Sequence, residues 1–591
     1  MHVATQKLKE GKVTADGWSA KMIKHISVSL LPILYIIFNF ILSRKLFPGK
    51  WLESTVIAVF KNKGARKLAK NFRPVSLVIM LFKLFDFILL KRFKDWFVPH
   101  DNQTAYQKGK SANDHIFLLR CLIDKVKKNR ETLFIAAIDF DGAFDRIKRS
   151  TLLKKLIIFG AGSAFVACIG NMYKYSMCNI FDSDTVTSYY LYSGIKQGLP
   201  LSPFLFLFYI NDIHDYFQTF FTNGFTYLDK LHMLVHADDL TIIATSREKM
   251  IKKIKILLSY CQLNDIIIQI SKCKFLVVNG TEMDKEPIPF QNENKLQASD
   301  NLDILGAFIS EDIKNDRHMK KRYKNVIKFL NYLKDNKYAP LIIKLKVLKA
   351  CVVSTLLYSC ETFGRKIPNG LDEIYLKLIK ATLNVRPSTP NNIVIVEAGM
   401  LPIKYLIWSR QLNYFRTFKD SLQENSTRKM LFEELLEHPS NYLKHYVDLE
   451  SKYVNAKEIY EEGKNFIKRE ITRKNNMDNH YKFWMYLNMN PDLKPSPFLM
   501  IPGKMALACV KFRVGSHNLP IEKGRWCRKP RNERLCKTCG MLGDEAHYIF
   551  VCPMICRDGM NLDNVNLETI WNDPNVYDLI KQLIEADYIG N

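Results

Sequence analysis

The sequence has no apolar leader segment. Its first twenty residues, MHVATQKLKEGKVTADGWSA, contain no continuous hydrophobic stretch of the kind that a secretory signal requires. We therefore do not expect secretion, and we predict an intracellular protein. The chain also contains no internal repeat and no low-complexity tract, which excludes repeat architectures and long linkers of biased composition.

The cysteines do not suggest a disulfide framework. There are 13 of them, an odd number, and they are scattered along the chain. Without a signal peptide, this pattern fits a reducing compartment in which most of the thiols are free and buried. Several cysteines lie close together in the sequence near the C-terminus, and they could form one metal site.

Acidic residues are fewer than basic ones. The chain has 87 Lys and Arg against 59 Asp and Glu, which gives a formal net charge of +28. A charge of this size favours polyanionic partners, either nucleic acid or an acidic membrane surface. A solvated basic surface without a partner would give the same count. The hydrophobic fraction of 47% is typical of a folded protein, and 591 residues suffice for several domains.

One stretch, residues 26–42 (ISVSLLPILYIIFNFIL), is almost wholly apolar. Its length is at the short limit for a membrane span, and Pro32 and Asn39 lie inside it. We predict one or two buried helices here, with a membrane span as the alternative.

The spacing of apolar residues predicts a mixture of helices and strands. Strands are expected at residues 54–60, 132–140, 275–278 and 304–309, and a hairpin at residues 234–245, where Ala-Asp-Asp interrupts two apolar runs. Helices are expected at residues 78–97 and after Ser111. Ser111 and Asp114 resemble a helix capping box. Residues 317–480 are predicted to be mainly helical.

Three aspartates lie in strongly apolar surroundings. Asp139 ends one predicted strand, and Asp238 and Asp239 lie at the tip of the hairpin. Burying carboxylates is costly unless they are paired or bind a cation. If these strands share one sheet, two Mg²⁺ ions would relieve the repulsion and could catalyse in-line phosphoryl transfer. Taken alone, Asp238 and Asp239 would favour an exposed turn over a metal site, because Asp is a turn residue.

The segments around these aspartates resemble the motifs of reverse transcriptases from non-LTR (LINE-type) retrotransposons. Residues 138–145 (IDFDGAFD) resemble motif A, residues 194–211 (GIKQGLPLSPFLFLFYIN) motif B, and Ala-Asp-Asp at 237–239 motif C. Further similarities, in the family's order, are residues 71–77 (NFRPVSL), 107–114 (QKGKSAND), 272–274 (KCK, motif D), 305–306 (LG, motif E) and 356–361 (LLYSCE, a thumb signature).

The resemblance implies roles for individual residues. Asp139 and Asp238 would be the main Mg²⁺ ligands, and Asp239 would complete the cluster. Lys272 would donate a proton to the departing pyrophosphate, although it could also be a solvated surface residue. The residues expected to contact the nucleotide are Phe140, Phe144, Gln197, Gly198 and Arg73, the last together with Lys61 and Lys63 of a basic loop.

Two of these expectations concern local structure. Phe144 would lie under the sugar and collide with a 2′-hydroxyl, which would select dNTP over rNTP. It could instead be an ordinary core residue. After Gln197 and Gly198, Ser202 is a natural helix N-cap and Pro203 fits the first helical position.

Two positions depart from the family pattern. The residue before Ala-Asp-Asp is normally Phe or Tyr, and here it is His236. A smaller, titratable ring near the primer end could reduce activity or make it pH-sensitive. In motif E, Ile304 occupies the usual position of Tyr, which we expect to matter less.

Cys536, Cys539, His547 and Cys552 are separated by two, seven and four residues. Three thiolates and one imidazole at such spacing suit tetrahedral Zn²⁺, although buried free cysteines are the alternative. Cys527 or Cys556 could replace one of the four. The flanking sequence is rich in Arg and Lys, and the arrangement resembles the C-terminal zinc knuckle of such retroelements, a plausible RNA or DNA binder.

We therefore predict an α+β fold, a right-hand polymerase with an antiparallel-sheet palm and a helical thumb, followed by a helical region and a small zinc-binding module. The expected regions are fingers 1–130, palm 131–310, thumb 311–420, helical connector 421–505 and zinc-knuckle region 506–591. The predicted function is an RNA-directed DNA polymerase that uses two Mg²⁺ ions, an RNA template, a DNA primer or target and dNTPs, with structural Zn²⁺ and no membrane partner.

Three points stay open at this stage. A catalytically inactive, retroelement-derived nucleic-acid-binding protein is the main alternative, and an RNA-templated RNA polymerase is disfavoured by Phe144. We find no endonuclease motif and expect no target cleavage by this chain alone. The location is nuclear or cytoplasmic, and nuclear action is implied by the resemblance only.

Overall fold

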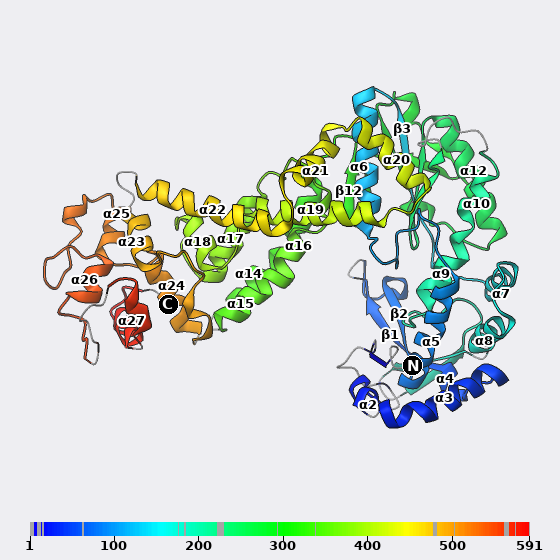
Figure 1. The fold of residues 1–591 in the computed structure, drawn as a ribbon, viewed down its shortest axis with the longest axis horizontal. Helices are drawn as coiled ribbons and strands as arrows, with labels where there is room; N and C mark the ends of the chain where they lie inside the picture. Colours follow the sequence, from blue (N-terminus) through cyan, green and yellow to red (C-terminus); the bar gives the residue numbers. More distant parts are fainter. Residues whose placement is uncertain are drawn as a thin grey trace. The chain divides into compact units, whose positions relative to one another are not determined.

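The computed structural model of the protein describes residues 5–589 except 7, 9–13, 15–16, 26, 62–63, 175, 183–184, 222–229, 292, 337–338, 477–480, 502, 559, 561–565 and 574. Lys63 of the basic loop therefore lies outside the described residues. The chain divides into two compact units, Met1–Ile313 with Phe418–Ser440, and Lys314–Thr417 with Asn441–Asn591 (Figure 1). Each unit has its own hydrophobic core. The predicted division into five regions stays a prediction.

The first unit combines helices and strands. Its helices are α2 (Ala20–His25), α3 (Ser27–Arg44), α4 (Gly49–Leu52), α5 (Met80–Trp96), α6 (Ala112–Asn129), α7 (Arg149–Ile158), α8 (Ser163–Lys174), α9 (Ser202–Asn211), α10 (Ile213–Gln218), α12 (Arg247–Leu263) and α20 (Thr427–Glu437), with short 3₁₀ turns at η1 (Ala69–Asn71), η2 (Ile270–Lys272) and η3 (Met283–Lys285). Its strands are β1 (Glu53–Phe60), β2 (Phe72–Leu77), β3 (Leu133–Asp139), β4 (Met177–Asp182), β5 (Thr185–Tyr190), β6 (Met233–His236), β7 (Asp239–Ala244), β8 (Lys274–Val278), β9 (Ile288–Pro289), β10 (Lys295–Ala298), β11 (Asn301–Ile304) and β12 (Ala307–Ser310).

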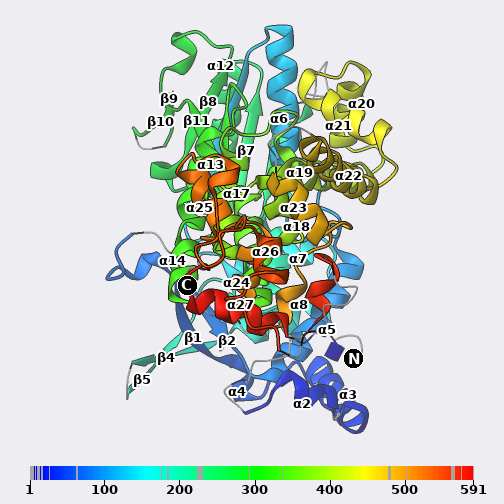
Figure 2. The same cartoon turned by 90° about the vertical axis from the view of Figure 1, so that its left-hand side faces the viewer.

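The central sheet has six strands in the order β6-β7-β3-β8-β10-β9. Figure 2 labels β7, β8, β9 and β10 of this sheet. Strand β3 pairs antiparallel with both β7 and β8. Its residues are almost all buried because the strand lies inside the sheet, which explains its continuous apolar sequence. The expected antiparallel palm is therefore present, with one departure: β10 runs parallel to β8.

A second sheet has the order β2-β1-β4-β5. β1 pairs antiparallel with β2 and parallel with β4, so this sheet is also mixed. The strand predicted at residues 304–309 is interrupted by a turn: Ile304 ends β11, Leu305 and Gly306 form the turn, and residues 307–309 belong to β12. Leu305 and Gly306 both have positive φ angles, of 51° and 76°, which reverses the chain there.

Helix α6 begins as predicted. Ser111 and Asp114 form a reciprocal capping box, in which the Asp114 carboxylate accepts the Ser111 backbone N–H at 3.1 Å. The apolar residues that recur at helical spacing are fully buried, namely Ile116, Leu119, Ile123 and Val126. Helix α20 packs against α6 although some 300 residues separate them in the sequence.

The apolar stretch near the N-terminus is helical but only partly buried. Helix α3 buries Leu34, Phe38 and Ile41, whereas Ile33, Ile36 and Phe40 are exposed. The prediction of buried helices is thus correct for one face only. None of the helices in the described part of the chain is long and apolar enough to cross a membrane.

The second unit is helical. Its elements are α13 (Asp316–Val326), α14 (Lys328–Asp335), α15 (Leu341–Val347), the π-helix η4 (Leu348–Val353), α16 (Ser354–Leu356), η5 (Cys360–Thr362), α17 (Leu371–Leu383), α18 (Asn391–Glu397), most of α19 (Ile403–Ser421), α21 (Asn441–Lys452), α22 (Ala456–Asn475), α23 (Tyr481–Met489), η6 (Pro497–Met500), α24 (Gly503–Arg513), α25 (Pro520–Trp526), η7 (Arg531–Glu533), α26 (Glu545–Phe550), η8 (Thr569–Asn572) and α27 (Val576–Glu585). The helical prediction for residues 317–480 is confirmed.

Candidate functional site

The three aspartates meet at one end of the central sheet. In the register of β3 against β7, Asp139 lies directly opposite Asp239. Strands β6 and β7 are joined by Ala237 and Asp238, and Ala237 has a positive φ of 54°. The strand ends thus bring together three carboxylates from two segments about 100 residues apart in the sequence.

The carboxylates affect one another electrostatically. Burial, and then the nearby charges of Asp238, Asp139 and Asp303, raise the pKa of Asp239 to about 6. Desolvation and Asp139 also raise the pKa of Asp238, although its side chain reaches the surface. Such crowding of negative charge is unfavourable for the protein alone. It suits divalent cations that take oxygen ligands.

Two basic residues face this cluster. The Lys272 ammonium lies 3.2 Å from Asp139 Oδ1, and its side chain is 56% exposed. Arg73, exposed on β2, is near enough to lower the pKa of Asp238. Lys61 acts on a different carboxylate, because its charge lowers the pKa of Asp145. Lys272 and Arg73 are therefore at the aspartate cluster, and Lys61 is near its flank.

The residues expected at the nucleotide differ in their exposure. The half-buried Phe144 ring stacks on Phe206, with centroids 4.8 Å apart and planes inclined by 22°. The Phe140 side chain is only 5% exposed and belongs to the core, so a nucleotide could contact only its backbone. The expected contact of Phe140 with the nucleotide stays a prediction.

Gln197 and Gly198 pack against β2. The Gln197 side-chain amide donates to Asp145 Oδ1 at 2.8 Å, and its backbone carbonyl accepts the Ser76 N–H at 2.7 Å. Gly198 has a φ of 119°, and a Cβ atom there would lie 2.7 Å from the Ser76 carbonyl oxygen. Glycine is thus required for the close approach of this turn to β2.

The start of α9 differs by one residue from the prediction. The N-cap is Leu201, so Ser202 and Pro203 are the first and second helical residues. The group that caps the helix belongs to another helix: the buried Asp86 carboxylate of α5 accepts the Leu201 N–H at 2.8 Å. A long-range partner of this kind has no local sequence signal.

His236 is held by a neighbour and stays neutral. Its Nδ1 lies 2.9 Å from Thr104 Oγ1. Burial lowers the pKa of His236 to about 4, so the ring carries no charge at neutral pH. The pH sensitivity expected from this residue therefore lies below pH 5. Ile304, the other departure, is a buried residue at the end of β11.

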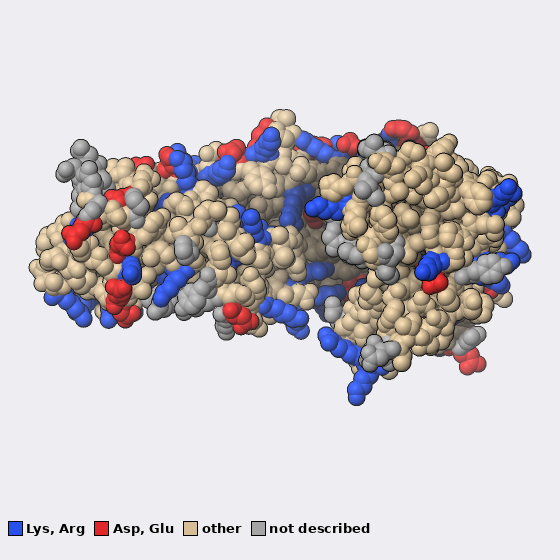
Figure 3. Space-filling model, turned by 90° about the horizontal axis from the view of Figure 1, so that it is seen from below, with Lys and Arg blue, Asp and Glu red and all other residues tan. Residues whose placement is uncertain are grey.

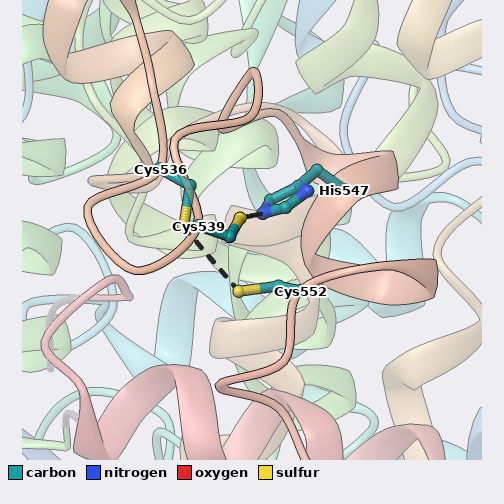
Figure 4. Close-up of side chains that lie close together, drawn as sticks. All are labelled: Cys536, Cys539, His547 and Cys552. Atoms are coloured by element: carbon teal, nitrogen blue, oxygen red, sulfur yellow. Dashed lines mark hydrogen bonds between the residues drawn. The ribbon is translucent and has the colours of Figure 1, made fainter.

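The C-terminal cysteines and histidine converge. The ligand atoms of Cys536, Cys539, His547 and Cys552 all lie within 4.8 Å of one another (Figure 4). Cys536 Sγ is 3.7 Å from Cys552 Sγ, and Cys539 Sγ is 3.3 Å from His547 Nε2. Tetrahedral ligands at Zn–S distances of about 2.3 Å need such spacing. The donor set therefore fits Zn²⁺, whereas Cys527 and Cys556 are exposed and lie outside the cluster.

Local structure presents these ligands. A tight turn after Cys536 is closed by the Gly540 N–H donating to the Cys536 carbonyl at 3.0 Å. Asp544 caps α26 by accepting the His547 N–H, also at 3.0 Å. Burial would raise the pKa of the Cys536 thiol, but hydrogen bonds from the Tyr548 hydroxyl and from backbone N–H groups lower it to about 5. The turn thus favours a thiolate, the form that binds metal.

Some of the basic residues that flank the cluster make contacts within the protein. Arg534 donates to the backbone carbonyls of Lys529 and Ile521. Arg531 lies over the Tyr481 ring at 4.2 Å. The expected basic rim is therefore smaller than the count of Arg and Lys in the sequence suggests.

Comparison with known proteins agrees with this geometry. The family model described as reverse transcriptase (RNA-dependent DNA polymerase) matches residues 60–309, which include all three aspartates. Residues 60–309 form a reverse transcriptase domain. It contains the central sheet, Phe144, Gln197 and Lys272.

Several retrotransposon proteins are similar to the chain. An uncharacterized 149 kDa protein of transposon TX1 from Xenopus laevis is 29% identical over 150 residues, which are 25% of this chain and 12% of that protein. A Pol polyprotein of the type-1 retrotransposable element R2 from Nasonia vitripennis is 26% identical over 216 residues, covering 36% and 21%. A probable RNA-directed DNA polymerase from transposon BS of Drosophila melanogaster is 23% identical over 231 residues, covering 38% and 25%.

The matched segments thus span at most a quarter of the length of these three relatives. Among solved structures, telomerase from Candida albicans is similar at 13% identity, with a TM-score of 0.35 over 68% of this chain and 67% of that one. The names of the relatives point to non-LTR retrotransposons, in line with the motifs read from the sequence.

The reverse transcriptase domain also uses residues that the motifs did not indicate. Gln103 Oε1 accepts the Ala237 N–H at 3.0 Å and so fixes the turn that carries Asp238. The neighbouring Thr104 N–H donates to the Val235 carbonyl, which adds residues 102–104 to the edge of β6. Asp303 adds a fourth negative charge near Asp239. These short polar segments have no periodicity from which a role could have been read.

Proposed function

We propose that this chain is an RNA-directed DNA polymerase of a non-LTR retrotransposon, which adds dNTPs to a DNA 3′-hydroxyl on an RNA template. The observation that carries the proposal is the register of Asp139 opposite Asp239, with Asp238 at the adjoining turn, inside a reverse transcriptase domain. Three carboxylates at one end of a rigid sheet suit a pair of Mg²⁺ ions.

The residues at the aspartate cluster would have different roles in the reaction. Asp139 and Asp238 would hold the ions and Asp239 would adjust their charge. Bound Mg²⁺ would supply activation of the 3′-hydroxyl and neutralisation of the pyrophosphate. Lys272, whose ammonium lies 3.2 Å from Asp139 Oδ1, would move a proton to the pyrophosphate. The Phe144 ring, backed by Phe206, would exclude a 2′-hydroxyl.

The partners follow from the same proposal. An RNA template, a DNA primer or target and dNTPs are polyanions, and the net charge of +28 favours them. Lys and Arg are spread over much of the face shown in Figure 3. Zn²⁺ held by Cys536, Cys539, His547 and Cys552 would stabilise a small module that contacts nucleic acid. We place this activity in the nucleus or cytoplasm.

The test is dTTP incorporation on poly(rA)/oligo(dT) with Mg²⁺. We expect Asp238→Ala to lower incorporation at least about 100-fold, because a cluster that neutralises transition-state charge would lose a ligand. The matched control is Asp141→Ala, which removes a nearby carboxylate that is paired with Arg146 at 2.9 Å. That variant should stay within a few-fold of the intact chain.

Two outcomes would oppose the proposal. Equal loss in both variants would mean that the metal site is not at Asp238. No incorporation by the intact chain, with RNA binding retained, would favour an inactive nucleic-acid-binding protein.

A further inference from the structure

The second unit contains a pocket of about 590 Å³ that is separate from the aspartate cluster. Helix α22 forms one wall, and η4, the segment from α18 to α19 and residues 492–495 form the others. Part of its lining is apolar, including Val353, Val396, Leu406 and Ile467. Its volume is in the range of pockets for single small ligands.

One face of α22 gives the pocket an aromatic and basic rim. Tyr460, Lys464 and Lys468 follow each other at four-residue spacing, so their side chains lie on the same face of the helix. The Tyr460 side chain is 41% exposed, which leaves its ring available. Lys464 pairs with Glu461 at 2.7 Å, so its charge is partly compensated.

The opposite side of the pocket adds two cations. Lys349 lies in the π-helix η4 and donates to the Gly399 carbonyl at 3.1 Å, and Arg410 lies on α19. The Arg410 guanidinium donates to Cys360 Sγ at 4.0 Å, and neither cation pairs with a carboxylate among the described residues. Burial lowers the pKa of Lys349, as expected for an ammonium without a close carboxylate. A π-helical segment such as η4 often lies at a functional site.

The acidic lining residues do not balance these cations. Glu461 is paired with Lys464, and Asp492 with Lys494 at 2.6 Å. Lys468 is near enough to Asp492 to lower the pKa of that carboxyl, so the excess of positive charge comes mainly from Lys349 and Arg410. An apolar floor, an exposed tyrosine and unbalanced cations together are the features by which proteins hold single-stranded nucleic acid.

We propose that this pocket binds one unpaired nucleotide of a single-stranded nucleic acid. The base lies against Tyr460 and the apolar floor, and the adjoining phosphates contact Lys349, Arg410 and Lys468. A base-paired nucleotide cannot enter, because its base is stacked within the duplex. The inference deepens the proposed function, on which it rests for the presence of a nucleic-acid partner, and assigns a strand-holding site outside residues 60–309.

The test uses a 12-nucleotide single-stranded RNA that carries fluorescein and one 4-thiouridine. Binding to the full chain is measured by anisotropy in the presence of a saturating, fully paired RNA–DNA duplex, which occupies the polymerase site and has no unpaired nucleotide, and the photo-crosslink is mapped by mass spectrometry. We expect Tyr460→Ala to weaken binding about 10-fold and Tyr460→Phe to preserve it, because base stacking needs the ring and not the hydroxyl. The crosslink should map to α22.

The role of the Lys468 charge can be tested against a matched control. Lys468 and the adjacent Arg469 are both exposed, but only Lys468 lines the pocket. Lys468→Ala should weaken binding and lower the slope of log affinity against log salt by about 0.7, the contribution of one phosphate contact. Arg469→Ala should leave both values unchanged.

Equal effects of Lys468→Ala and Arg469→Ala would overturn the inference, as would crosslinks that avoid α22. Equal competition by a 12-base-pair duplex or by polyglutamate would do the same, because the pocket would then only collect negative charge. Failure of the polymerase proposal is distinguishable. If the chain incorporates no dNTP but binds RNA in a Tyr460-dependent way, the proposed function fails and this inference stands. If it incorporates dNTPs but binds RNA independently of Tyr460, the proposed function stands and this inference fails.

Discussion

Asp239 illustrates how a single carboxyl depends on residues that are distant in the sequence. Burial and the charges of Asp238 and Asp139 raise the pKa of Asp239. The motifs indicated all three of these aspartates. Asp303 also contributes, and nothing in its surrounding sequence indicated a role. Motifs identify residues that perform chemistry, whereas the residues that adjust their charge are defined only by proximity in the folded chain.

Phe144 should determine the choice of sugar. Its ring is fixed by stacking on Phe206, so Phe144→Val should open space for a 2′-hydroxyl. We expect the preference for dTTP over UTP to fall about 10- to 100-fold, measured as the ratio of kcat/KM values on poly(rA)/oligo(dT). An unchanged ratio would show that Phe144 is an ordinary core residue.

His236 should not make activity pH-dependent near neutrality. Because its pKa is lowered to about 4, the ring is neutral from pH 6 to pH 9. His236→Gln keeps a partner for Thr104 and cannot titrate in this range. The activity of the variant relative to the intact chain should therefore be constant from pH 6 to pH 9. A ratio that changes with a midpoint near pH 6.5 would contradict the lowered pKa.

At the scale of elements, α9 depends on a buried acid. Asp86 caps its N-terminus, burial raises the pKa of Asp86 to about 7, and Oδ1 has no partner among the described residues. The folded state binds more protons than the unfolded state between about pH 4 and pH 7. The contribution of this group to stability is therefore largest at low pH and falls as pH rises through 7.

Asp86→Asn should test this linkage. Asparagine keeps an oxygen for the Leu201 N–H and does not ionise, so the variant should gain up to about 2–4 kcal/mol over the intact chain at pH 8 and little at pH 4.5. The measurement is the difference in Tm at the two pH values. Asp95→Asn, at an exposed position of the same helix, should shift Tm equally at both. A pH-independent effect of Asp86→Asn would refute the raised pKa.

We expect the short elements around the C-terminal cluster to depend on metal. Helix α26, which carries His547, has only six residues, too few to be stable alone. Purified protein should contain one zinc ion per chain, measured by elemental analysis. Cys552→Ser should lose it and lower Tm, whereas Cys556→Ser, outside the cluster, should retain it. Zinc retained in both variants would exclude this ligand set.

At the scale of the whole molecule, the sequence predicted what is local. The hairpin with Asp238 and Asp239, the buried strand before Asp139 and the capping box of α6 were read from short patterns and are present. The spacing also indicated Cys536, Cys539, His547 and Cys552 as one candidate metal site, and the structure brings these four residues together.

What the sequence did not predict depends on long-range packing. The exposed face of α3, the parallel pairing of β10 with β8 and the return of α20 to the first unit have no local signal. The pocket beside α22 is built from segments about 140 residues apart, so its lining is not visible as a motif.

The most direct test of the account is single-nucleotide extension of a labelled DNA primer on an RNA template of defined sequence, with Mg²⁺ and one dNTP at a time. The account predicts extension only by the complementary dNTP, none after chelation of Mg²⁺, and loss of extension in Asp139→Asn and Asp238→Asn but not in Asp141→Asn. Extension that persists in both metal-site variants, or that ignores the template base, would contradict the central claim that these aspartates form a templated polymerase site.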